Sequence, residues 1–194
     1  MTQASKVTFV DGGKVEILTS RLLLRGAREN DAHSLHEAFS DPEVMRYWST
    51  TPHRSKKETS EWLLKMISSP QNGVTDFVIT LPNGDAIGKI GVWQDNEIGF
   101  LLSQQNWGKG FAREAMLGIL EYLFTNRSLV EITADIDPRN RRSISVLESM
   151  GFVKVGFKEK TWEVGGEWVD SVYYSLTKAS WEQKQAASGQ ESST

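Results

Sequence analysis

An amphipathic pattern between two strand-like runs is the feature that most restricts how this chain of 194 residues can fold. Apolar residues recur at helical spacing from Ala112 to Phe124, which indicates a helix with one buried face. Glu97 to Ser103 precedes it as a strand-like run, and from Val130 to Ile136 apolar and polar residues alternate with the period of a half-buried strand. A strand, a helix and a strand in this order predict a right-handed crossover between two parallel strands.

The segments on either side of this unit predict further helices and mainly antiparallel strands. Pro82-Asn83-Gly84-Asp85 is a turn signal between two apolar runs and predicts a hairpin. The expected strands are 15–25, 77–79, 87–93, 97–103 and 130–136, with two more on either side of Gly165-Gly166. The expected helices are 31–39, one that follows the capping-box pattern at Ser55 with Trp62, Leu63, Met66 and Ile67 facing inward, 112–124 and 140–150.

This order of elements predicts one α+β domain over residues 1–185. We expect three layers, in which helices cover both faces of a mixed, mostly antiparallel sheet of about six or seven strands. One domain suits the length, because a single core usually serves about 100 to 200 residues. The small and polar residues 186–194 are expected to form a disordered tail.

Composition and charge exclude several classes of function. The formal net charge is −3, so no overall positive field attracts a nucleic acid. The chain has no cysteine, which excludes disulfides, a thiolate nucleophile and thiolate-bound metals. Its three histidines lie in the N-terminal quarter without metal-ligand spacing, so we expect no metal site. We find no run of eighteen apolar residues and no signal peptide, and therefore expect a cytoplasmic protein without membrane contacts.

A glycine-rich turn stands between the strand-like run and the amphipathic helix. The turn reads Gln105-Asn106-Trp107-Gly108-Lys109-Gly110. Free amides and the helix dipole make a helix N-terminus a site for a phosphate anion, and glycines let a pyrophosphate approach the backbone closely. The alternative is a plain glycine turn with no ligand.

A second motif follows one helix and one strand later, where Asn140 and Ser143 open a helix that Gly151-Phe152 closes. The order and spacing of the two motifs resemble motifs A and B of the GCN5-related N-acetyltransferases (GNAT). Thr19 to Arg25 and Asp41 to Trp48 look like the opening of the RimJ/RimL-like branch of that family. That branch acetylates protein N-termini and various small amines, and the resemblance covers nearly the whole chain.

The resemblance implies a GNAT-type fold in which acetyl-CoA lies in a cleft between a splayed central pair of strands, 97–103 and 130–136. Backbone amides of the first strand would bond the pantetheine arm, and the glycine turn would hold the pyrophosphate. Asn140 would bond the pantetheine arm, or it serves as the N-cap of the last helix. The residues implied in acetyl-CoA binding are Phe100, Leu101, Leu102, Gln105, Trp107, Gly108, Lys109, Gly110, Ala112, Arg113 and Asn140. Arg139, Arg141 and Arg142 could meet the adenosine 3′-phosphate or simply form a solvated helix face.

The resemblance also implies two catalytic residues. Ser143 would donate a proton to the leaving thiolate, because the tyrosine that many relatives use one turn later is Leu147 here; alternatively, Ser143 bonds the first helical turn. Glu97 would accept the proton of the amine, directly or through a water, or it is a solvated strand-end carboxylate. Asp95 and Asp135 are the lesser candidates. The acceptor pocket is expected to involve Trp48, His53, Trp162 and Trp168, with core packing as the alternative.

The function implied is transfer of an acetyl group from acetyl-CoA to a primary amine by direct attack in a ternary complex. The acceptor is a protein N-terminus or a small-molecule amine, and the protein acts as a monomer or homodimer. The alternative is a catalytically inactive CoA-binding regulatory module. Such a module would keep the glycine turn and Asn140 but have no functioning base or acid at Glu97 and Ser143.

Overall fold

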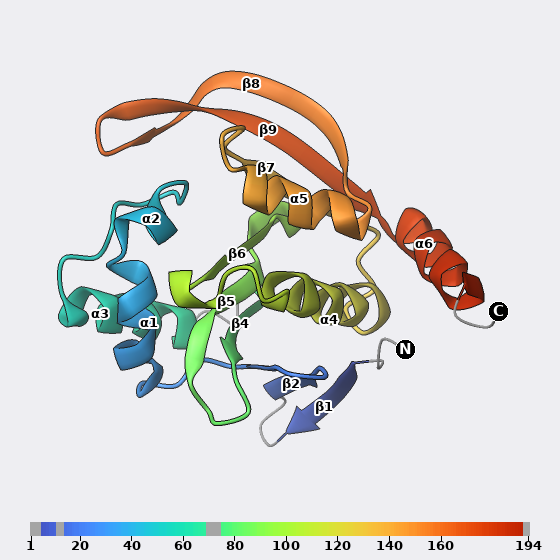
Figure 1. Ribbon diagram of the computed structural model, residues 1–194, viewed down its shortest axis with the longest axis horizontal. Helices are drawn as coiled ribbons and strands as arrows, with labels where there is room; N and C mark the ends of the chain where they lie inside the picture. The colour runs from blue at the N-terminus through green and yellow to red at the C-terminus, as the bar shows by residue number, and fades with distance from the viewer. Residues whose placement is uncertain (1–4, 11–13, 69–74, 192–194) are drawn as a thin grey trace.

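The computed structural model describes residues 5–10, 14–68 and 75–191, and Figure 1 shows how its helices and strands are arranged. The strands are β1 (Lys6–Val10), β2 (Lys14–Leu18), β3 (Leu23–Arg25), β4 (Thr75–Thr80), β5 (Ala86–Val92), β6 (Ile98–Leu102), β7 (Glu131–Ile136), β8 (Val153–Val164) and β9 (Glu167–Thr177). The helices are α1 (Asp31–Phe39), α2 (Pro42–Met45), α3 (Lys56–Ser68), α4 (Phe111–Thr125), α5 (Arg141–Met150) and α6 (Lys178–Glu191), with 3-10 turns η3 (Gln94–Asn96) and η4 (Gln104–Asn106). The expected α+β class is confirmed.

The N-terminal strands differ from the expectation of one strand over residues 15–25. The chain turns at Thr19, whose hydroxyl accepts from the backbone N–H of Leu22 at 3.0 Å, so β2 and β3 are separate antiparallel strands. This local side-chain bond replaces the ladder bonds that would have continued the strand. A further strand, β1, pairs with β2 from Lys6 opposite Leu18 to Val10 opposite Lys14, and it was missed because Met1 to Lys14 is largely polar.

The central strands divide into two sheets. The first sheet has the order β1-β2-β3-β4-β5-β6 and is antiparallel throughout, and the second has the order β7-β9-β8. An isolated parallel bridge between Glu97 and Thr133 links them, so the predicted crossover through α4 is confirmed. Beyond this bridge β6 and β7 diverge, which confirms the splayed pair. Instead of one sheet of six or seven strands, the splay yields separate sheets of six and three strands.

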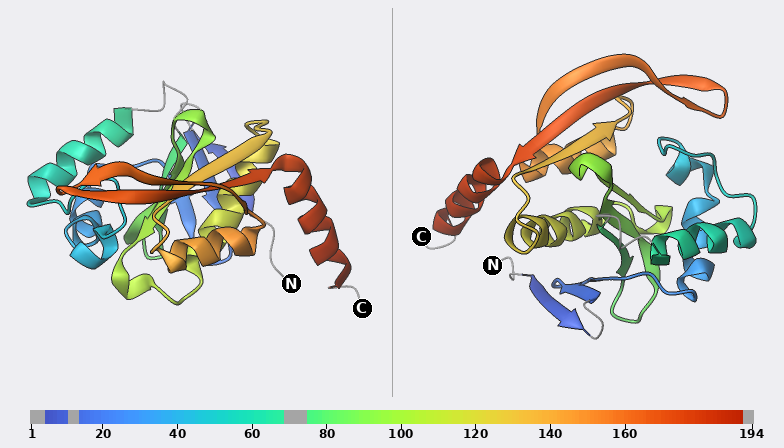
Figure 2. Two further views of the ribbon diagram at one scale, coloured as in Figure 1. Left: turned by 90° about the horizontal axis from the view of Figure 1, so that it is seen from above. Right: turned by 180° about the vertical axis from the view of Figure 1, so that it is seen from behind.

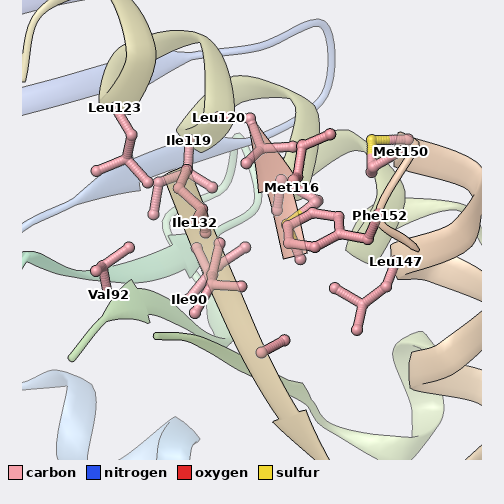
Figure 3. Close-up of a cluster of buried hydrophobic side chains, with 14 of the residues drawn as sticks. Ile90, Val92, Met116, Ile119, Leu120, Leu123, Ile132, Leu147, Met150 and Phe152 are labelled. Atoms are coloured by element: carbon pink, nitrogen blue, oxygen red, sulfur yellow. The ribbon is translucent and has the colours of Figure 1, made fainter. Parts of the chain in front are cut away.

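Helix α4 lies against one face of the first sheet, and α1 and α3 cover the other face (Figure 1). The core under α4 continues to β7 and α5, and Figure 3 shows Ile90, Met116, Ile119, Ile132 and Leu147 among its packed side chains. The helical face expected between 112 and 124 is therefore confirmed. This packing fixes the start of α4 next to the end of β6.

The inward face of α3 is narrower than expected. Leu63 and Met66 are buried and Trp62 is half-buried, but Ile67 is 36% exposed. The buried stripe is centred on Thr59, Leu63 and Met66, and one residue further along a helix turns the side chain about 100° away. Ile67 therefore lies on the flank of the stripe.

Residues 186–191, which belong to the segment expected to form a disordered tail, are helical. Helix α6 continues to Glu191, and residues 192–194 lie outside the described part of the chain. Trp181 anchors the helix, because its ring is 6% exposed and lies 6.2 Å from the ring of Phe124. Among the described residues, no helix combines the length and the apolar character needed to cross a membrane.

Candidate active site

A cleft of about 980 Å³ opens beyond the point where β6 and β7 meet. Its walls come from the second half of β6, the glycine turn, the first turns of α4 and α5, and the segment around α2. The lining residues are Glu43, Val44, Arg46, Tyr47, Trp48, Phe100, Leu101, Leu102, Asn106, Trp107, Gly108, Gly110, Phe111, Ala112, Arg113, Arg139, Asn140, Arg141, Arg142, Ser143, Ser145 and Val146. Segments that are far apart in the sequence thus meet at one opening. The β8–β9 hairpin extends past α5 toward the side of α2 (Figures 1 and 2).

The glycine turn has the backbone that a phosphate site requires. Gly108 and Gly110 have φ of 72° and 79°, in the left-handed region that favours glycine. A Cβ atom at Gly108 would meet no atom within 4 Å, so the space beside it is open. The first amides of α4 have no partner within the helix, and both glycines line the cleft. The turn can therefore hold an anion at the positive end of the helix dipole.

Most of the residues expected to bind acetyl-CoA line the cleft. The lining includes Phe100, Leu101, Leu102, Trp107, Gly108, Gly110, Ala112, Arg113 and Asn140. Gln105 and Lys109 lie outside it: Gln105 Nε2 donates to Glu37 at 3.4 Å, and Lys109 Nζ donates to Asn106 at 3.4 Å. The side chains of these two residues are occupied with the protein itself.

Asn140 and Ser143 lie together at the start of α5. The side-chain oxygen of Asn140 accepts from the backbone N–H of Ser143 at 3.1 Å, so Asn140 is the N-cap of the helix, as the structural alternative predicted. Both residues line the cleft. The Ser143 hydroxyl makes no hydrogen bond within the described residues, so the interpretation that its side chain bonds the first helical turn is not supported.

Glu97 stands at the vertex of the splay, opposite Thr133 and outside the lining of the cleft. Side chains alternate along a strand, so Glu97, Gly99 and Leu101 share one face of β6, the face that α1 and α3 cover. The bridge places Thr133 and Asp135 on the same face. Glu97 is half-buried, and Asp135 Oδ2 accepts from Nε1 of Trp162 at 3.0 Å. Two carboxylates are therefore near the vertex, while the side chain of Asp95 is outside the described residues.

Trp48 is the residue of the expected acceptor pocket that lines the cleft. Its ring lies 3.6 Å from the position that a Cβ atom would take at Gly99, and 5.7 Å from Nζ of Lys89. Lys89 forms an ion pair with Asp76 at 2.8 Å, and both side chains are nearly buried. The ammonium of Lys89 also lies 5.3 Å from the ring of Trp62. The ammonium of Lys89 is thus a nearly buried cation between the rings of Trp48 and Trp62, and its cation–π interaction stabilises the position of the Trp48 ring.

The other three residues of that pocket have different places. His53 is 7% exposed, stacks on Phe39 at 4.9 Å and shares a hydrogen bond of 2.9 Å with Thr59, which is the packing alternative. Trp162 and Trp168 are 51% and 55% exposed in the β8–β9 hairpin. Trp162 pairs with Val169 and Trp168 with Glu163, so the two indoles lie on opposite faces of the hairpin. Trp162 shares the face of Asp135.

The arginines at the start of α5 are not equivalent. Arg139 donates to Asp137 at 2.7 Å and to Glu167 at 3.0 Å, which raises its pKa and ties the hairpin to the start of α5. Arg142 instead lies over the ring of Trp107, 4.5 Å from its centroid, and is exposed. Arg141 is exposed as well. Arg141 and Arg142 therefore form a cationic rim next to the glycine turn.

The segment around α2 is a wall of the site that sequence reasoning did not assign. Glu43, Val44, Arg46 and Tyr47 line the cleft. The signal for the local structure is Asp41-Pro42: the Asp41 side chain accepts from the Glu43 N–H at 2.8 Å, and proline occupies the first turn. The described residues contain no group of three or more His, Cys, Asp or Glu side chains that could hold a metal ion.

Comparison with known proteins gives one consistent result. Residues 21–153 match the family model of the acetyltransferase (GNAT) domain. The uncharacterized N-acetyltransferase p20 of Bacillus licheniformis is 34% identical over 84% of this chain and 96% of its own length. The [ribosomal protein uS5]-alanine N-acetyltransferase of Escherichia coli is 26% identical over 87% of this chain and 93% of its own. The crystal structure of spermidine N-acetyltransferase from Vibrio cholerae in complex with CoA and spermine superimposes with a TM-score of 0.73 at 25% identity, covering 84% and 99% of the two chains.

Proposed function

We propose that this chain, which belongs to the GNAT family of acetyltransferases, transfers the acetyl group of acetyl-CoA to a primary amine by direct attack in a ternary complex. The chain is an acyl-CoA-dependent acetyltransferase, as its family and named relatives are. The observation that carries the proposal is the cleft, which brings the glycine turn, the open edge of β6, Asn140 and Ser143 to one opening. A donor that is long, with a pyrophosphate at one end and a thioester at the other, suits this arrangement.

The donor is positioned by backbone rather than by charged side chains. Amides of Gly108 to Ala112 would donate to the pyrophosphate at the positive end of α4. Backbone groups of Phe100 to Leu102 would bond the pantetheine arm as an added strand, since β7 has turned away from them. One of these amides would stabilise the oxyanion that forms during attack. The side-chain N–H₂ of Asn140 would donate to the pantetheine arm, since its oxygen caps α5.

The reaction makes a C–N bond and breaks a C–S bond. The amine nitrogen attacks the thioester carbonyl, and the tetrahedral intermediate collapses with release of the CoA thiolate. The proton of the amine passes to Glu97 through a water, because Glu97 lies outside the lining of the cleft. The Ser143 hydroxyl protonates the thiolate and is resupplied from solvent. Deprotonation of the amine at pH 7 costs about 1 kcal/mol for a protein N-terminus and about 4.6 kcal/mol for a lysine, so the base is needed most for the more basic amines.

The acceptor that we propose is a protein N-terminus or a small-molecule amine. Two of the relatives act on such amines, because their names specify the alanine of a ribosomal protein and spermidine. The amine would approach the vertex from the face that carries Trp48, Glu97 and Asp135. The position of Glu97 outside the cleft favours one other candidate, a catalytically inactive module that only binds CoA.

Thiol release from acetyl-CoA, measured against a panel of amines and N-terminal peptides, tests the proposal. We expect turnover with at least one class of acceptor and none with acetyl-CoA alone above slow hydrolysis. Calorimetric binding of CoA without turnover on any amine would instead support the inactive module. Absence of both binding and turnover would refute both candidates.

A further inference from the structure

One arginine connects the turn between β2 and β3 to the start of α4. Arg21 donates from Nε to Oε2 of Glu114 at 2.7 Å and from Nη1 to the carbonyl oxygen of Lys109 at 3.0 Å. Its guanidinium lies over the ring of Phe111, 4.7 Å from the centroid. A Cβ atom at Gly110 would be 3.4 Å from Nη2 of Arg21. A single side chain therefore contacts the glycine turn and the first turn of the helix that follows it.

The other half of this connection is the carboxylate of Glu114. It accepts from the hydroxyl of Thr19 at 2.6 Å, the hydroxyl of Ser20 at 3.1 Å and the backbone N–H of Arg21 at 2.7 Å. Its side chain is 12% exposed. Burial raises the pKa of Glu114, but these hydrogen bonds outweigh burial and lower it overall, so the group stays ionised. The first turn of α4 is thus fixed to the β2–β3 turn by several bonds to one carboxylate.

The bond to Lys109 determines how the glycine turn presents its amides. In a planar trans peptide the carbonyl and the following N–H point in opposite directions. Because the carbonyl of Lys109 points to Arg21, the N–H of Gly110 points away from Arg21. Gly110 lines the cleft, whereas Arg21 is not among the lining residues. The N–H of Gly110 is therefore aimed toward the side on which a pyrophosphate would lie.

We propose that Arg21 and Glu114 form a clamp that holds the Lys109–Gly110 peptide in the orientation that binds the pyrophosphate of CoA. This inference rests on the proposed function, since it concerns the donor of that reaction. Arg21 is a positioning residue: it acts through the peptide and does not touch the donor. Its charge is neutralised by Glu114, so the clamp works by geometry and not by adding positive charge to the site.

The test compares two acyl donors, acetyl-CoA and S-acetylpantetheine, which has the thioester but no pyrophosphate. Arg21→Met should raise the Kd for CoA and lower kcat/KM for acetyl-CoA, each about tenfold, with kcat nearly unchanged. It should change kcat/KM for S-acetylpantetheine by less than about twofold. Glu114→Gln loosens the clamp from the other side and should show the same selectivity for donor. Arg28→Met is the matched control, because Arg28 is exposed and its contact to Glu16 is 3.6 Å long.

Several results would overturn the clamp. An unchanged Kd for CoA in both Arg21→Met and Glu114→Gln would do so, and equal losses with the two donors would show a merely structural role. Arg21→Lys keeps the charge without the forked geometry, so full recovery of CoA affinity in that variant would also contradict the clamp. If the wild type binds CoA but acetylates no amine, the proposed function fails while the Kd values still decide about the clamp. If the wild type does not bind CoA, both fail.

Discussion

A methyl group at Gly91 should break the buried ion pair that supports Trp48. A Cβ atom there would lie 1.9 Å from Oδ1 of Asp76 and 2.6 Å from the carbonyl oxygen of Thr75. The clash with Oδ1 requires the Asp76 carboxylate to leave Nζ of Lys89, from which it is 2.8 Å away. The clash with the carbonyl oxygen requires the backbones of β4 and β5 to shift apart as well. The side chains of Lys89 and Asp76 are 10% and 12% exposed, so water can restore little of the lost stabilisation.

The size of the effect follows from this burial. Separating the partners of a buried ion pair leaves two poorly solvated charges, and losses of this kind are about 3–5 kcal/mol. In a domain of this length each kcal/mol lowers Tm by about 2–4 °C, so Gly91→Ala should lower Tm by roughly 6–20 °C. Lys89, whose Nζ lies 5.7 Å from the ring of Trp48, loses its carboxylate partner at the same time, so the position of Trp48 in the cleft should be affected as well.

Urea unfolding followed by tryptophan fluorescence measures this loss. Gly26→Ala is the matched control, because a Cβ atom at Gly26 meets nothing within 4 Å and its φ is not positive. Its free energy of unfolding should remain within about 1 kcal/mol of the wild type, on the stabilising side. If the free energy of unfolding of Gly91→Ala also remains within about 1 kcal/mol of the wild type, the Lys89–Asp76 ion pair does not stabilise the protein as argued, and the reasoning is refuted.

Four further substitutions test the site and the fold. Glu97→Gln should lower turnover by about 10²- to 10⁴-fold and alter its pH profile, with the affinity for CoA unchanged. The thiol-release assay measures this turnover. An unchanged rate at every pH would show that another group accepts the proton of the amine. Ser143→Ala should slow turnover moderately at constant Tm. Asn140→Ala should destabilise the protein by about 1 kcal/mol through loss of the α5 cap. Thermal melts that show a lower Tm for Ser143→Ala and an unchanged Tm for Asn140→Ala would contradict these roles. Burial lowers the pKa of His53 below the ordinary value of 6.5, despite the opposing charge of Glu58. The unfolded chain therefore binds a proton more readily at this residue than the folded protein does. The contribution of His53 to stability is full above pH 6.5 and is lost as the pH falls below 6.5. Urea unfolding of His53→Gln should show a shallower fall below pH 6.5, and a fall as steep as that of the wild type would exclude His53 as the cause.

Features with a local cause could be predicted from the sequence. The crossover through α4 follows from the periods of its helix and strands, and the left-handed backbone at Gly108 and Gly110 follows from the glycines themselves. Asn140 caps α5 because its side chain reaches an amide three residues away. In each of these cases the deciding partners are close along the chain, so the pattern contains the information.

Features that depend on distant partners could not be predicted in the same way. Arg21 and Glu114 are 93 residues apart and meet only because β2, β3 and α4 pack as they do. His53 was assigned to the acceptor pocket from its place in the sequence, but stacking on Phe39 and the bond to Thr59 decide its position. The division into two sheets likewise depends on how the strands twist apart after the Glu97–Thr133 bridge, which no residue pattern reports.

The splay of β6 and β7 has a mechanical consequence for the whole molecule. Strand β6 is largely buried, as an inner strand is. After the bridge at Glu97, however, its backbone no longer pairs with β7, so in its hydrogen bonding it is an edge strand. A pantetheine arm bonded along β6 would connect the two sheets. The enzyme would thus be stiffest while it holds its donor, with slower amide hydrogen exchange in both sheets. CoA keeps the same pantetheine arm after it has lost the acetyl group. Release of CoA, rather than acetyl transfer, would therefore restore the flexibility of the structure.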